Sequence, residues 1–166
     1  MATNPQPTVL VIFGGGGDLT HRKLVPAVYD LYLDERLPTP FAVMGVDRVA
    51  MNDEAYRQHL RTGVDQFCRH GKADDAAWNA FATCLSYLQA DIMAPASYAE
   101  LGEKLAGMDR TWQKETNRLF YLATAPTLME KINQQLSQAK LVADRKRTRV
   151  VVEKPFGRDL ASAVEL

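Results

Sequence analysis

The chain has 166 residues, 46% of them hydrophobic, and its 20 lysines and arginines balance its 20 aspartates and glutamates. That length suits one globular domain, so we expect residues 1–166 to form a single domain. The even charge disfavours proteins that bind nucleic acids or anionic membranes. No apolar run approaches the roughly 20 residues that span a bilayer, and Met1–Pro7 lacks the basic region of a signal peptide. We therefore expect a cytoplasmic protein in which Cys68 and Cys84 are free thiols and no metal site forms.

Apolar runs alternate with helical patterns along the whole chain. In chain order the predicted elements are strand Thr8–Phe13, helix Asp18–Glu35, strand Phe41–Val46, helices Asp53–His70 and Asp74–Ala82, strand Leu85–Gln89, helix Pro95–Leu105, strand Leu119–Ala123, helix Pro126–Lys140 and strand Arg149–Glu153. This alternation indicates βαβ crossovers around a parallel sheet that is covered on both faces. The sequence therefore predicts the α/β class, as a Rossmann-like doubly wound parallel sheet flanked by helices.

A run of four glycines, Gly14–Gly17, ends the first predicted strand and leads into a helix. Glycine has no Cβ and tolerates positive φ, so a pyrophosphate can approach backbone N–H groups at the positive end of that helix. The run matches the GxGxxG pattern only loosely, because Gly14 and Gly16 fit and Leu19 takes the third place. It predicts nucleotide binding, with a plain strand-to-helix turn as the alternative.

Three further segments follow predicted strands, at the edge where open α/β sheets bind ligands. After the second strand, Arg48 favours the 2′-phosphate of NADP, whereas Asp47 would accept a hydrogen bond from the ribose 2′-OH of NAD. A solvated Asp-Arg turn is the alternative there. After the third strand, Asp91 and Ile92 would lie beside the adenine, although Asp91 would equally cap the next helix. After the fifth strand, a following proline directs Lys154 towards an anionic substrate, with a surface lysine as the alternative.

Several enzyme classes lack their motifs in this chain. His21, His59 and His70 have no evident acidic or nucleophilic partner in the sequence, so none is expected to act as a general base. No Tyr-x-x-x-Lys pair occurs, which disfavours a short-chain dehydrogenase, and no GK[ST] occurs, which excludes a Walker A loop.

Four segments, in this order, resemble the N-terminal coenzyme domain of glucose-6-phosphate dehydrogenases: Gly14–Pro26, Gly45–Arg48, Asn117–Pro126 and Glu153–Leu160. The resemblance implies a pyrophosphate cradle at Gly14–Lys23, Arg48 on the 2′-phosphate of NADP, and Lys154 against both coenzyme and substrate. It also implies that Lys23 lies near the phosphate of the sugar. The predicted coenzyme-binding residues are Gly14, Gly15, Gly16, Gly17, Asp18, Leu19, Arg48, Asp91, Ile92 and Lys154, and the predicted substrate-binding residues are Lys23 and Lys154.

The implied reaction is oxidation of glucose 6-phosphate to 6-phosphogluconolactone in the pentose phosphate pathway, with hydride transfer to NADP. Asp47 keeps NAD as an alternative coenzyme. The family takes its catalytic base from an RIDHYLGKE segment, which these 166 residues do not contain, and its β+α substrate domain is also absent. We therefore assign no catalytic residue and expect the chain alone to be inactive.

The last segment, Asp159–Leu166, begins like a capped helix and stops after about two turns. We accordingly expect the chain to be cut from a longer protein, with a naturally short chain as the alternative. A stand-alone module that binds or senses NADP without catalysis, and a structural remnant that binds nothing, are the rival functions. No nucleic-acid or membrane partner is expected, and a homo-oligomer is compatible with the sequence.

Overall fold

The computed structural model describes residues 6–154, and the predicted helix at Asp159–Leu166 lies outside them. Five strands form one sheet in the order β3-β2-β1-β4-β5, and every neighbouring pair is parallel. The strands are β1 Thr8–Phe13, β2 Phe41–Asp47, β3 Leu85–Gln89, β4 Asn117–Leu122 and β5 Thr148–Val152. This order confirms the predicted Rossmann-like doubly wound sheet.

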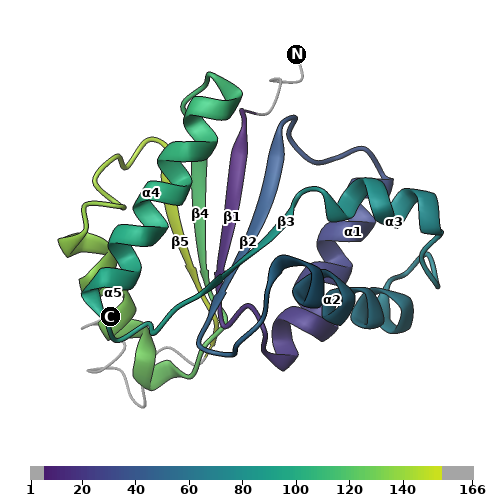
Figure 1. The fold of residues 1–166 in the computed structure, drawn as a ribbon, viewed down its shortest axis with the longest axis horizontal. Helices are drawn as coiled ribbons and strands as arrows, with labels where there is room; N and C mark the ends of the chain where they lie inside the picture. The colour runs from purple at the N-terminus through teal and green to yellow at the C-terminus, as the bar shows by residue number, and fades with distance from the viewer. Residues whose placement is uncertain (1–5, 155–166) are drawn as a thin grey trace.

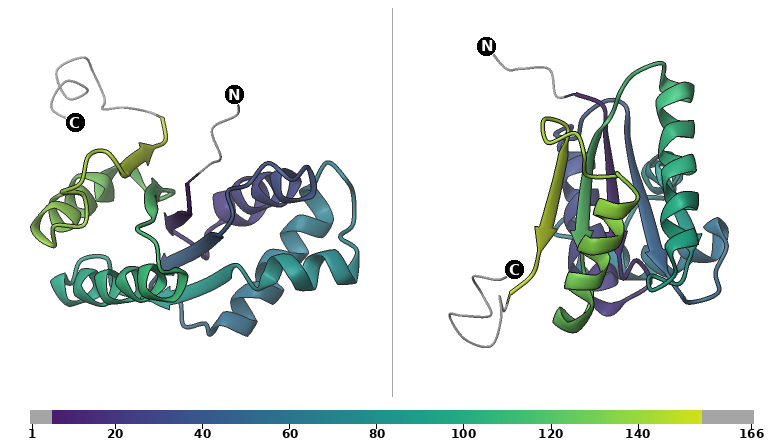
Figure 2. Two further views of the ribbon diagram at one scale, coloured as in Figure 1. Left: turned by 90° about the horizontal axis from the view of Figure 1, so that it is seen from above. Right: turned by 90° about the vertical axis from the view of Figure 1, so that its left-hand side faces the viewer.

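Helices cover both faces of the sheet (Figure 1). On one face lie α1 (Val25–Leu33), α2 (Asp53–Phe67) and α3 (Asp75–Ala82), and on the other lie α4 (Pro95–Trp112) and α5 (Pro126–Gln138). Figure 2 separates these layers in two further views. β3 is the edge strand on one side of the sheet, and β4 lies on the other side of β1. Helix α4, which connects β3 to β4, therefore crosses to the second face. The strand order therefore reverses between β1 and β4, where doubly wound folds open a crevice for ligands.

The central strand, β1, shows why these apolar runs form a buried parallel sheet. Val9, Val11 and Phe13 pack into the core beneath α4 and α5. Leu10 and Ile12 pack into the core beneath α1, α2 and α3. Because successive side chains point to opposite faces, a strand covered on both sides needs a continuous apolar run rather than an alternating one.

The first predicted helix, Asp18–Glu35, differs from the observed structure in type. Residues Thr20–Leu24 form a π-helical turn, η1, in which the Val25 N–H donates to the Thr20 carbonyl, and α1 follows. Pro26 lies in the first turn of α1 and has no N–H to continue the regular ladder of hydrogen bonds. The change of helix type therefore coincides with the proline.

Helix α4 is longer than predicted, reaching Trp112 instead of Leu105. Met108 and Trp112 continue its buried stripe against the core, and Gln113 ends the helix in the left-handed region at φ 52°. The other predicted elements are confirmed, with ends that differ by a few residues. None of the helices within residues 6–154 has the length and apolar character needed to cross a bilayer.

Candidate dinucleotide-binding site

The carboxyl ends of all five parallel strands meet at one edge of the sheet, the lower edge in Figure 1. This edge gathers segments that are far apart in the sequence. They are the glycine loop after β1, Arg48 after β2, Asp91 after β3, Thr124 after β4 and Lys154 after β5. Because the switch point between β1 and β4 lies within this edge, the glycine loop enters the crevice where such sheets bind ligands.

The glycine loop lies pressed between the ends of β2 and β4. Gly14 has φ +82°, and a Cβ added there would overlap the carbonyl oxygen of Ala123. A Cβ added to Gly15 would lie 2.5 Å from the Cα of Gly45. The N–H groups of Gly14 and Gly15 both donate to the Val46 carbonyl, at 2.9 and 3.2 Å. These two positions therefore require glycine, because any side chain would push the loop off its neighbouring strands.

The loop closes into the start of a helix. The Gly17 N–H and the Thr20 hydroxyl both donate to the Gly14 carbonyl, at 3.0 and 2.9 Å. The first helical hydrogen bond runs from the His21 N–H to the Gly17 carbonyl at 3.1 Å, so the three N–H groups before His21 have no intrahelical acceptor. A helix start without side-chain caps, behind a loop without Cβ atoms, fits a diphosphate. Thr20 lies within the predicted cradle, but its hydroxyl was not among the predicted binding residues.

The side chains of Asp47 and Arg48, at the end of β2, have different surroundings. The Asp47 carboxylate is half-buried, and its Oδ2 accepts a hydrogen bond from the Gly16 N–H at 3.1 Å. Its Oδ1 accepts from the N–H of Arg48 at 2.8 Å. The Arg48 side chain is exposed and forms no hydrogen bond or ion pair with any residue in 6–154. The acidic group is therefore held on the glycine loop, and the guanidinium is left available.

The predicted adenine neighbours, Asp91 and Ile92, follow β3 at the same edge. Asp91 does not cap α4, because the N-cap is Ala94 and the Asp91 carboxylate instead accepts from the Met93 N–H at 2.9 Å. Ile92 lines a small apolar crevice beside the ends of β1 and β2. Its carbonyl accepts from the Tyr98 hydroxyl at 2.8 Å. The structure thus gives Ile92 an apolar setting at the edge and leaves Asp91 exposed.

The two predicted substrate lysines both have exposed side chains. Lys23 lies in η1 and Lys154 follows β5, and neither forms an ion pair with a residue in the described part of the chain. Beside Lys154, the Glu153 carboxylate accepts a hydrogen bond from the hydroxyl of Tyr121 on β4. Burial, together with this carboxylate, raises the pKa of Tyr121 to about 12, so the phenol stays protonated and ties β4 to β5. This pairing holds the end of β5 that presents Lys154.

The three histidines lie in or contact helices α1 and α2. The rings of His21 and His59 lie 4.6 Å apart, and burial, with His59 beside it, lowers the pKa of His21. His70 lies 3.5 Å from the carboxylate of Asp34, so the expectation that it has no acidic partner is wrong. Within residues 6–154 no cluster of metal-ligating side chains occurs, and both described cysteines are free.

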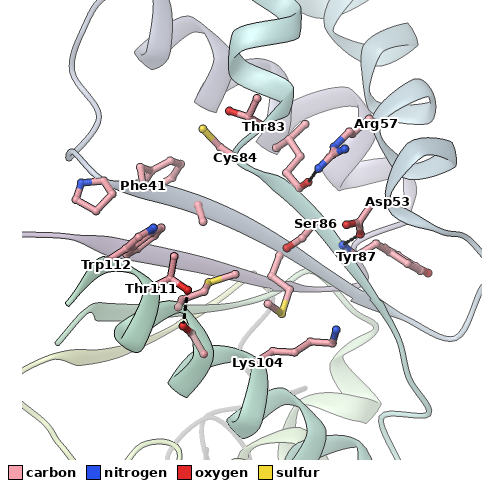
Figure 3. Close-up of a pocket in the computed structure, with 16 residues that line it drawn as sticks. Phe41, Asp53, Arg57, Thr83, Cys84, Ser86, Tyr87, Lys104, Thr111 and Trp112 are labelled. Carbon is pink, nitrogen blue, oxygen red and sulfur yellow. Dashed lines mark hydrogen bonds between the residues drawn. The ribbon is translucent and has the colours of Figure 1, made fainter. Parts of the chain in front are cut away.

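A hollow of about 550 Å³ lies between α4 and the edge strand β3, away from every predicted site residue (Figure 3). Where α2 borders the hollow, Arg57 donates to the Leu85 carbonyl at 2.8 and 3.1 Å, and Asp53 accepts from the Tyr87 N–H at 2.7 Å. These α2 side chains satisfy backbone groups on the outer edge of β3. The hollow is therefore bordered by a covered sheet edge.

Comparisons with known proteins agree with this geometry. The family described as "Glucose-6-phosphate dehydrogenase, NAD binding domain" matches residues 11–166. Glucose-6-phosphate 1-dehydrogenase of Bacillus subtilis is 38% identical over 100% of the chain and 33% of its own length. The Chlamydia pneumoniae enzyme is also 38% identical, over 96% of the chain and 32% of its own length. The chain thus spans about a third of the length of these curated relatives.

Solved structures show the same relationship. The crystal structure of glucose-6-phosphate 1-dehydrogenase from Mycobacterium avium superposes with a TM-score of 0.81 at 33% identity, covering 97% of this chain and 32% of that one. A glucose-6-phosphate dehydrogenase in complex with glucose-6-phosphate gives a TM-score of 0.85 at 31% identity, covering 99% of this chain and 34% of the other. The chain therefore belongs to the NAD-binding domain family of the glucose-6-phosphate dehydrogenases.

Proposed function

We propose that this chain is the coenzyme-binding domain of an enzyme that oxidises the C1 hydroxyl of glucose 6-phosphate to 6-phosphogluconolactone and passes the hydride to NADP. The observation that carries the proposal is the glycine loop, which brings bare backbone and an uncapped helix start to the switch point of the sheet. The kinship with enzymes named glucose-6-phosphate 1-dehydrogenase supports the choice of substrate.

In this proposal the diphosphate lies against Gly14–Leu19 and accepts hydrogen bonds from the free N–H groups that precede His21, where the positive end of the helix stabilises its charge. The exposed guanidinium of Arg48 pairs with the 2′-phosphate, because its planar fork suits two phosphate oxygens. Asp91 and Ile92 flank the adenine. Support for these roles is the common strand edge and the free guanidinium, since the diphosphate and the adenosine must lie along one continuous surface.

Two lysines would bind the anionic substrate. Lys154, at the end of β5, contacts both the nicotinamide coenzyme and glucose 6-phosphate, and Lys23 contacts the sugar phosphate. Their exposed, unpaired ammonium groups support this role. The nicotinamide, when bound, supplies the hydride acceptor. No RIDHYLGKE segment occurs in residues 1–166, so we propose that these residues bind coenzyme without turnover.

Equilibrium titration of the purified 166-residue chain with NADP tests the binding proposal, and we expect saturable one-to-one binding. Adding glucose 6-phosphate should produce no rise in nicotinamide absorbance. Absence of saturable binding would favour the alternative that the chain is a structural remnant that binds nothing. Appreciable turnover would contradict the proposal that residues 1–166 lack a catalytic base.

Lysine variants test the substrate role in the full-length enzyme. Lys154→Ala and Lys23→Ala should each raise the KM for glucose 6-phosphate by about tenfold, the effect of losing one charge-assisted contact. Lys114→Ala, in the turn before β4 at the opposite end of the sheet, is the matched control and should leave KM unchanged. An unchanged KM in both lysine variants would remove these residues from the substrate site.

A further inference from the structure

We infer that Asp47 is a specificity-determining residue that admits NAD to the site alongside NADP, an inference that rests on the proposed coenzyme-binding function. Asp47 is the last residue of β2, and the register pairs its neighbour Val46 with Phe13 of β1. The carboxylate therefore reaches the glycine loop that follows β1. Its two oxygens accept from separate backbone N–H groups, of Gly16 at 3.1 Å and Arg48 at 2.8 Å.

The surroundings hold Asp47 in this orientation. The segment after β2 is anchored by the Tyr87 hydroxyl, which donates to the Val49 carbonyl at 2.7 Å. A Cβ added to Gly16 would lie 3.0 Å from the Met51 methyl and 3.4 Å from the Asp47 carboxylate. Side chains from this segment therefore pack directly on the glycine loop. Such packing does not fit a solvated Asp-Arg turn, the alternative that the sequence leaves open.

A carboxylate in this place distinguishes two kinds of ribose. An ionised carboxylate has about four lone-pair sites, and the two backbone N–H groups occupy two of them. The remaining sites can accept hydrogen bonds from the hydroxyls of an unphosphorylated adenosine ribose. A 2′-phosphate has no such donor, and its negative charge is repelled by the carboxylate. Asp47 therefore favours the coenzyme without the 2′-phosphate.

The neighbouring Arg48 acts in the opposite direction. Its exposed guanidinium has no partner within residues 6–154 and can pair with a 2′-phosphate through two parallel hydrogen bonds. Two adjacent residues thus carry opposite preferences, one fixed on the loop and the other free in solvent. Because the repulsion by Asp47 offsets the attraction by Arg48, the site discriminates weakly and accepts both coenzymes.

Equilibrium titration of the full-length protein with NAD⁺ and with NADP⁺, at one fixed ionic strength, tests this inference. The ratio of the two Kd values should lie within about tenfold of unity, and Asp47→Ala should shift it at least about tenfold towards NADP⁺, the effect of one hydrogen bond to a charged group. Asp47→Asn keeps an acceptor for the Gly16 N–H, so it isolates the charge and should shift the ratio the same way. Arg48→Gln should shift the ratio towards NAD⁺.

The matched control is Glu115→Gln, which removes one exposed carboxylate before β4, at the opposite end of the sheet, and should leave the ratio unchanged. Thermal melts of each variant check that it folds. A parent protein that binds NADP⁺ more than about 100-fold tighter than NAD⁺ would overturn the inference. So would Asp47 variants that fold and keep the parent ratio within about twofold. Saturable binding of neither coenzyme by the parent would overturn the proposed function, and this inference with it.

Discussion

Replacing Gly15 by alanine isolates the close approach between the glycine loop and β2. The added Cβ would lie 2.5 Å from the Gly45 Cα and 2.8 Å from the Val46 nitrogen, all backbone atoms that cannot rotate away. Carbon atoms normally pack about 3.5–4.0 Å apart, so the loop must retreat by about 1 Å. That movement breaks the hydrogen bonds from Gly14 and Gly15 to the Val46 carbonyl. Overpacking and the two lost bonds together cost about 3–5 kcal/mol of unfolding free energy.

Urea denaturation followed by tryptophan fluorescence measures this loss, and coenzyme titration of the same samples should show weaker binding. Gly107→Ala in α4 is the control, because a Cβ there has its nearest contact, the Arg110 guanidinium, at an ordinary 3.7 Å. Alanine in that helix interior should stabilise the protein by up to about 1 kcal/mol. If Gly15→Ala kept both the stability of the parent, within about 1 kcal/mol, and its coenzyme affinity, the steric reasoning would be refuted.

Three further substitutions test contacts elsewhere in the fold. The buried Asp30 carboxylate accepts from the Cys68 thiol at 2.9 Å and from the Arg69 side chain at 3.2 Å. Burial opposes ionisation of Asp30, but these hydrogen bonds outweigh burial and lower the pKa of Asp30 below the usual 3.8. The contribution of Asp30 to the free energy of unfolding is therefore complete above pH 3.8 and is lost as the pH falls through the lower pKa of the folded state. Asp30→Ala should therefore lower the free energy of unfolding by about 2–3 kcal/mol at pH 7. Denaturation curves should show that this difference between parent and variant shrinks in acid, and a difference that does not change with pH would contradict the linkage. Tyr56→Phe removes a hydroxyl that is buried without a partner in the described residues, so its melting temperature should not fall below that of the parent. Arg57→Ala leaves the Leu85 carbonyl on the edge of β3 without its hydrogen-bond donor, so light scattering should detect more self-association than in the parent. An unchanged molecular mass would show that Arg57 does not prevent association through this edge.

The order of the elements and the position of the glycine loop were readable from local sequence. Apolar runs such as Thr8–Phe13 alternate with helical patterns, and strands covered on both faces are continuous in hydrophobicity. The glycines stand where the first strand ends, so the turn between strand and helix follows from residue type. The π-helical turn at Thr20–Leu24 could not be foreseen, because residue type there is equally compatible with an ordinary helix. Its only local signal was Pro26.

Local sequence was enough to place Asp47 and Arg48 at the end of the second strand and a lysine after the fifth. Which of Asp47 and Arg48 faces the glycine loop depends instead on the folded sheet, in which Val46 pairs with Phe13 of the neighbouring strand. The contact between the Asp47 carboxylate and the Gly16 N–H joins residues 31 positions apart. Side-chain direction in a strand follows from register and packing, and these arise from contacts that no local pattern specifies.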